Sequence, residues 1–168
     1  GYKVSILVNG RVNNEYKVLD DVNIISLCDK FEEYHNLKLS KKISLRRKAL
    51  KKVKPDFLIS FLPYIQVLSL ISSFGLRIRR IETVRISPWN ANIRANMVNY
   101  LLWILSFNTC YKIIVQNEEQ KLFFKNRVAR KCVVIPNPLE TYFIDKYKRD
   151  FDDNVCKFMA VGRISKQK

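Results

Sequence analysis

The last segment of the chain combines residue types that bind phosphate groups. A short apolar run, predicted to be a strand, leads directly into Gly162 and Arg163, and Lys168 follows five residues later. Glycine allows the backbone to turn, arginine offers a planar fork of donors to phosphate oxygens, and lysine adds a point charge. The loop is therefore a candidate phosphate site, although a Gly-Arg turn with a nearby lysine also arises by chance.

Arg85 is a second candidate, because it begins a polar loop directly after another predicted strand. Open parallel sheets bind their ligands at the carboxyl ends of the strands, where this loop lies. Two interpretations stay open: Arg85 binds an anionic group of a substrate, or it is a surface arginine at a strand end. Asn117 and Gln120 form a later polar group, whose spacing is typical of a helix cap.

Residues suited to metal or acid–base chemistry are sparse. The only histidine is His35, and no two of the four cysteines form a C-x-x-C pair: Cys28, Cys110, Cys132 and Cys156. We therefore expect no metal site and interpret the cysteines as reduced thiols, with Cys132 buried at the start of a strand. His35 lies in a stretch predicted to be a surface loop. No paired carboxylates suited to acid–base catalysis are visible.

The chain is strongly basic, since its 168 residues contain 31 Lys and Arg against 15 Asp and Glu, a formal net charge of +16. Nucleic acid, anionic lipid and nucleotide phosphates all qualify as partners. The stretch from Lys38 to Lys54 has nine basic residues and no acid. Four apolar residues share one face of the helix predicted there: Leu39, Ile43, Leu50 and Val53. This amphipathic helix either covers the sheet with a solvated outer face, or binds a membrane surface or polyanion.

The elements that must position these residues are short β-branched runs alternating with stretches of helical periodicity. This pattern predicts an α/β fold with parallel strands. The predicted strands are residues 2–8, 22–27, 56–60, 80–84, 111–115, 132–135 and 157–161. The apolar run from Phe57 to Leu76 is long enough to span a bilayer, but Pro63 divides it into a buried strand and a buried helix. A further apolar helix is expected through Met97 and Leu105.

The order of several motifs resembles the retaining family 4 glycosyltransferases, which have the two-domain GT-B fold. These motifs are K-P-D-F-L-I-S-F-L-P-Y, I-E-T-V-R-I-S-P, I-I-V-Q-N-E-E-Q-K-L-F-F, K-C-V-V-I-P-N-P-L and V-G-R-I-S-K-Q-K, and together they cover nearly the whole chain. The resemblance implies a Rossmann-like acceptor-side domain at residues 1–139, a linker at 140–154, and the start of a donor-binding domain at 155–168. It also implies a chain that is truncated at both ends.

The resemblance assigns roles to the candidate residues. Gly162, Arg163 and Lys168 match the positions that bind the donor diphosphate, where the two cations would neutralise the charge that grows on the leaving nucleoside diphosphate. Arg85 stands where many members have a histidine that faces the interdomain cleft, and it is the candidate catalytic residue. Neither a metal nor a cofactor is expected beside the nucleotide-sugar donor.

The expected function is sugar transfer to a polysaccharide or lipid-linked glycan. The protein is expected in the cytoplasm, with the stretch from Lys38 to Lys54 as a contact to the inner face of the cell membrane. The chain alone is expected to be inactive, because the family's acidic donor-binding pair would lie beyond Lys168. The alternative is a non-catalytic basic module that binds nucleic acid or another polyanion. Trp89 and Trp103 do not form a stacking platform among basic residues, so no nucleic acid is expected. A third interpretation is a degenerate product without activity.

Overall fold

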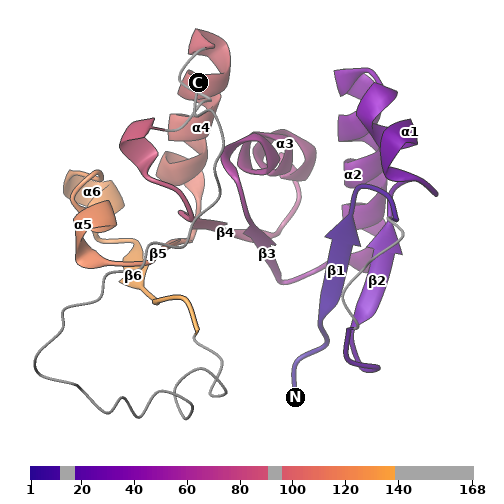
Figure 1. The fold of residues 1–168 in the computed structure, drawn as a ribbon, viewed down its shortest axis with the longest axis horizontal. Coiled ribbons are helices and arrows are strands. Elements are labelled where there is room, and N and C mark those ends of the chain that lie inside the picture. Colours follow the sequence, from indigo (N-terminus) through magenta and orange to yellow (C-terminus); the bar gives the residue numbers. More distant parts are fainter. Residues whose placement is uncertain (12–17, 91–95, 139–168) are drawn as a thin grey trace, which may run out of the picture. The chain divides into compact units, whose positions relative to one another are not determined.

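The computed structural model describes residues 1–11, 18–90 and 96–138 of the chain (Figure 1). Gly1–Pro136 form one compact unit, and Asn137–Lys168 belong to a second unit. The predicted linker at 140–154, the predicted donor-binding segment at 155–168 and its strand at 157–161 lie outside the described residues. They therefore stay predictions.

Within the described residues, six parallel strands form two sheets. In the smaller sheet, β1 (Ser5–Val8) pairs with β2 (Asn23–Ser26). The larger sheet has the order β3-β4-β5-β6. Its strands are β3 (Phe57–Ser60), β4 (Arg79–Thr83), β5 (Lys112–Val115) and β6 (Cys132–Val134). Helices connect and flank these strands, so the chain has the predicted α/β architecture with a Rossmann-like parallel sheet.

The described helices are α1 (Phe31–Asn36), α2 (Leu39–Val53), α3 (Pro63–Ser73), α4 (Met97–Thr109), α5 (Glu118–Lys121) and α6 (Asn126–Ala129), with a 3-10 turn at Pro88–Asn90. Helices α2, α3 and α4 lie where apolar periodicity predicted them, α5 begins at the predicted cap, and two short helices, α1 and α6, were not predicted. Pro63 takes the first helical position of α3, where its missing N–H costs no hydrogen bond. α3 contacts α2, α4 and β3. None of the helices described is both long and apolar enough to cross a membrane.

The core lies between the larger sheet and helices α3 and α4. Trp103, Phe107 and Ile113 are fully buried there, and Phe124 packs edge-on against Phe107 with their ring centroids 4.9 Å apart. The Trp103 indole N–H donates to the side chain of Gln66 on α3, so the one polar atom of this large ring is paired. Burial of these aromatic side chains supplies much of the apolar area that stabilises the unit.

β3 differs from the buried strand that the sequence predicted. Phe57, Ile59 and the following Phe61 are exposed, whereas Leu58 is half-buried and Ser60 is buried. Successive side chains of a strand point to opposite faces, and α3 packs against β3. β3 is also the end strand of its sheet, so only one face of it contributes to the core. The buried helix that was predicted after Pro63 is confirmed.

His35 is exposed, as predicted, but it lies in helix α1 instead of a loop. Its ring stacks on Phe31 one turn earlier at a centroid distance of 6.3 Å, and its carbonyl accepts a hydrogen bond from Lys42 Nζ at 2.9 Å. A helix of six residues has too little apolar periodicity to be recognised in a sequence.

Candidate functional site

The carboxyl ends of β3 and β4 bring Phe61 and Arg85 together. Arg85 is the second residue after β4, is half-buried, and has its guanidinium carbon 5.6 Å from the centroid of the Phe61 ring. This is the geometry of a cation–π contact, which holds the arginine over the end of the neighbouring strand. Arg85 thus lies at the ligand-binding edge of a parallel sheet, while its role in substrate binding stays a prediction.

The amino terminus of α3 lies at the same edge. Leu62 directly follows Phe61 and is the N-cap residue of α3, with φ 69° and ψ 141°. A positive φ in a non-glycine residue costs about 1–3 kcal/mol, and such residues cluster at functional sites. The cap makes no side-chain hydrogen bond to the first turn. Because helix amino termini attract anions, Arg85 and α3 together present positive potential at this edge.

The end of β5 carries the predicted helix cap. The side-chain oxygen of Asn117 accepts from the Gln120 backbone N–H at 2.8 Å, and Gln120 Oε1 accepts from the Gln116 backbone N–H at 2.9 Å. The second bond goes to the residue before the cap and not to the cap residue itself. These amides are used within the protein, which confirms the capping interpretation of this polar group.

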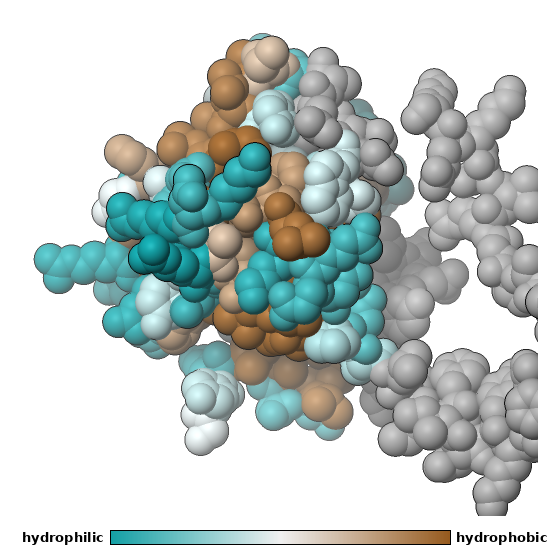
Figure 2. Space-filling model, turned by 90° about the vertical axis from the view of Figure 1, so that its left-hand side faces the viewer, coloured by the Kyte–Doolittle hydropathy of each residue, from teal (hydrophilic) through white to brown (hydrophobic). Residues whose placement is uncertain are grey.

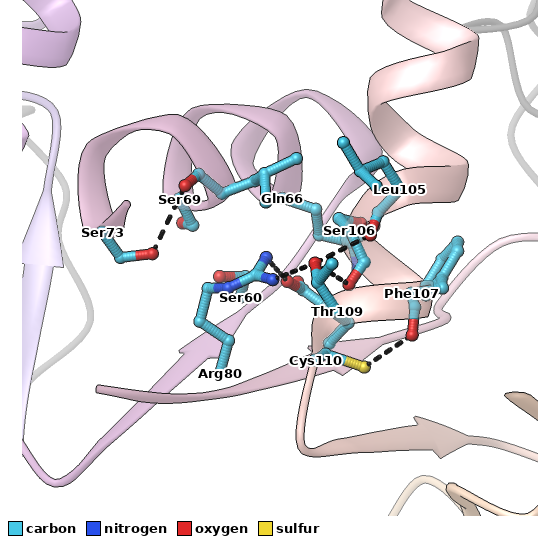
Figure 3. A network of polar contacts seen from close by, with 12 residues as sticks. Ser60, Gln66, Ser69, Ser73, Arg80, Leu105, Ser106, Phe107, Thr109 and Cys110 are labelled. Carbon is cyan, nitrogen blue, oxygen red and sulfur yellow. Dashed lines mark hydrogen bonds and ion pairs between the residues drawn. The ribbon is translucent and has the colours of Figure 1, made fainter. Parts of the chain in front are cut away.

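A buried ion pair, Arg80 with Glu82, lies on β4 and was not singled out in the sequence. Arg80 Nη1 is 2.9 Å from Glu82 Oε1, and Arg80 Nη2 donates to Thr109 Oγ1 at 2.6 Å. Figure 3 shows Arg80 extending from its strand toward Thr109 at the end of α4. Residues 80 and 82 share one face of the strand because side chains alternate, and opposite charges two residues apart in a predicted strand are the signal that could have found the pair.

Burial raises the pKa of the Glu82 carboxyl to about 8, and the neighbouring Arg80 charge only partly opposes this effect. Glu82 is fully buried, and its Oε2 atom and the Ser60 hydroxyl are the buried side-chain atoms that have no hydrogen-bond partner in the described part of the chain. Ser60 and Glu82 are partners in the register of β3 and β4. A protonated Glu82 carries a donor that an ionised one lacks, so the neutral carboxyl suits this environment better.

Two arginines of helix α2 donate hydrogen bonds to other parts of the fold. Arg46 is buried, with Nε donating to Tyr34 Oη at 3.1 Å and Nη2 donating to Asn9 Oδ1 at 2.6 Å. Arg47 Nη1 donates to the Ser72 carbonyl at 3.0 Å at the carboxyl end of α3, where a cation also opposes the helix dipole. Four lysines of the helix are exposed: Lys41, Lys48, Lys51 and Lys52. The solvated outer face that was predicted for this helix is therefore present.

The apolar residues predicted to share one face of α2 are buried to different degrees. Leu50 is buried and Ile43 is half-buried, whereas Leu39 and Val53 at the two ends of the helix are exposed. Only the middle of the helix thus packs as the periodicity predicted.

The three described cysteines, Cys28, Cys110 and Cys132, have free thiols. Burial raises the pKa of the Cys110 thiol to about 11, and it also raises the pKa of the other two thiols, so the reactive thiolate is disfavoured in all three. Cys132 does start a strand, but it is half-buried instead of buried. The described residues contain no group of three side chains that could hold a metal ion.

The candidate donor-binding residues Gly162, Arg163 and Lys168 lie outside the described residues, as does Cys156. Their roles rest on the sequence. Of the candidate site residues that the sequence predicted, only Arg85 lies within the described part of the chain.

Comparisons with known proteins do not assign a family to this chain. A scan against models of protein families finds no match, and a search of curated proteins finds no significant match.

Proposed function

We propose that the protein is a retaining glycosyltransferase that transfers a sugar from a nucleotide-sugar donor to a polysaccharide or lipid-linked glycan. The observation that carries the proposal is Arg85 beside the positive end of α3, at the carboxyl edge of a Rossmann-like sheet. The order of motifs described above supports it as well.

In this reaction the bond between the anomeric carbon and the diphosphate oxygen breaks, and negative charge grows on the leaving nucleoside diphosphate. Arg163 and Lys168 would neutralise that charge, and fixed positive groups stabilise such a transition state more than the ground state. Arg85 would bind a phosphate of the donor or an anionic group of the acceptor. A glycosidase-type carboxylate pair is not required for this chemistry.

Calorimetric titration of the complete full-length protein with uridine- and guanosine-diphosphate sugars tests the proposal. Arg163→Ala and Arg85→Ala should each weaken binding by about 1.5 to 3 kcal/mol, as expected for charged hydrogen bonds. Arg77→Ala is the matched control, because Arg77 is an exposed arginine that precedes β4 at the opposite edge of the sheet. Absence of binding at millimolar nucleotide sugar would rule out the proposal.

The proposal includes a cytoplasmic location and a peripheral contact with the inner face of the cell membrane through the stretch from Lys38 to Lys54. The exposed lysines of α2 support this contact, since each basic residue near an anionic leaflet contributes about 1 kcal/mol.

The same exposed lysines favour a second candidate function, a non-catalytic module that binds polyanions. Such binding would be salt-sensitive and indifferent to the identity of the polyanion, because it would consist of counterion release. Competition between heparin and a nucleotide sugar in the same titration separates the two candidates. A module of this kind would bind heparin and leave the nucleotide sugar unbound.

A further inference from the structure

The outward side of α4 is apolar and carries no charge. The helix reads M-V-N-Y-L-L-W-I-L-S-F-N-T, without a single Asp, Glu, Lys or Arg. Its inner side buries Trp103, Ser106 and Phe107. The opposite side exposes four large apolar side chains: Met97 at 70%, Val98 at 65%, Leu101 at 59% and Leu105 at 46%. We call these four residues the α4 apolar row.

The α4 apolar row is a continuous surface and not a set of scattered residues. Met97, Leu101 and Leu105 follow one another at intervals of four residues, which places them in line along one side of a helix. Figure 2 shows hydrophobic side chains gathered at the top of the view, where α4 lies. Water-exposed helices normally carry charged residues on this side.

A row of lysines lies on α2, the other helix that flanks α3. Lys41, Lys48, Lys51 and Lys52 are exposed on the side of α2 opposite its buried residues Arg46 and Leu50. α3 contacts both α2 and α4 and is itself mostly buried. The lysine row and the α4 apolar row therefore lie on two helices that flank the same helix, α3.

We propose that the α4 apolar row enters the interface of an anionic lipid bilayer while the lysines of α2 bind its headgroups. Apolar side chains beside a basic row are the composition of helices that lie in the membrane interface. Charge complementarity favours this occupant over a second copy of the chain, because self-association would bring together two chains of net charge +16. The inference rests on the proposed membrane contact of α2 and adds the part of the protein that inserts.

Sedimentation of the full chain with phosphatidylcholine vesicles that contain phosphatidylglycerol tests the inference. The variant L101S/L105S should lower the partition coefficient by about tenfold or more, since two apolar side chains that the bilayer would bury are replaced by small polar ones. L122S is the matched control, because Leu122 is an equally apolar and exposed residue near α5. The control should bind like the unchanged protein.

A second measurement does not depend on the folding of that variant. Leu101→Trp keeps an apolar side chain at the site, and its fluorescence should be quenched by brominated acyl chains when vesicles are added. If the quenching is absent and L101S/L105S binds vesicles like L122S, the inference is wrong. Vesicle binding that is sensitive to salt would still support the proposed membrane contact of α2. If vesicles bind no protein at all, both fail. If sedimentation equilibrium shows a dimer that L101S/L105S dissociates, the α4 apolar row is an interface between two copies of the chain and the inference is wrong. None of these results affects the nucleotide-sugar titration that tests the proposed function.

Discussion

Glu82 is an acidic residue that lies fully buried in the described part of the chain. Its carboxyl is fully buried beside Arg80, and burial raises its pKa to about 8 from an ordinary value of 4.5. A carboxyl with a raised pKa binds its proton more tightly in the folded state than in the unfolded state. Its contribution to stability is therefore fully present below pH 4.5 and is lost as the pH rises to about 8.

We predict that the free energy of unfolding falls between pH 5 and pH 8 by about 1 kcal/mol per pH unit, and that Glu82→Gln removes most of this slope. Glutamine is neutral at every pH, and its amide oxygen can still accept from Arg80. Urea unfolding at a series of pH values measures the slope in both proteins. The prediction fails if the two proteins keep the same slope.

The backbone of Leu62 is strained, because its φ of 69° is a conformation that favours glycine. We predict that Leu62→Gly stabilises the protein by about 0.5–1 kcal/mol, since the side chain is exposed and little packing is lost. Leu122→Gly is the control: Leu122 is also exposed but has helical dihedral angles, so the same change should destabilise. Chemical denaturation of both variants measures the two changes in the free energy of unfolding. Destabilisation by Leu62→Gly would contradict the prediction.

At the scale of elements, α2 combines two kinds of cation that look the same in the sequence. Arg46 is buried between Tyr34 and Asn9, whereas Lys48 points away from the fold. Periodicity predicted the helix and its solvated face, but it did not predict that an arginine would take a position on the buried side. A phenol and an amide supply the acceptors there, and both come from other elements.

We predict that Arg46→Ala lowers the free energy of unfolding by about 2 to 3 kcal/mol, because two hydrogen bonds of a buried cation are lost. Lys48→Ala on the same helix should change it by less than about 0.5 kcal/mol, as is usual for an exposed residue. Thermal and urea unfolding of both variants make the comparison. Equal effects would show that Arg46 is no more structural than its exposed neighbour.

At the scale of the whole molecule, the net charge of +16 opposes the compact state through mutual repulsion of like charges. We predict that raising the concentration of sodium chloride from low to physiological values raises the melting temperature by about 2 to 4 °C, the shift that ~1 kcal/mol produces. The variant K48Q/K51Q has two fewer positive charges and should respond less. A melting temperature that falls with added salt would contradict this prediction.

The fold could be predicted from the sequence because its signals are local. Five of the described strands lie within the runs that predicted them, β4 begins one residue earlier than predicted, and Pro63 and Asn117 mark helix starts at the expected positions. The division into two sheets and the exposure of Phe57 depend on which strands pair, which no local pattern contains. The site was predicted only in part for the same reason: Arg85 follows its strand as expected, whereas its contact with Phe61 and the strain at Leu62 arise from tertiary structure.

The exposed side of β3 has a consequence for how a cell would produce this protein. Phe57, Ile59 and Phe61 form an apolar line on an end strand, and such strands recruit other unfinished chains before folding is complete. Holdase chaperones bind segments of this kind. A newly made chain is therefore either bound by a chaperone or aggregates into inclusion bodies. Ile59→Thr keeps a β-branched residue in the strand and lowers the hydrophobicity of the side chain. It should raise the soluble yield on expression.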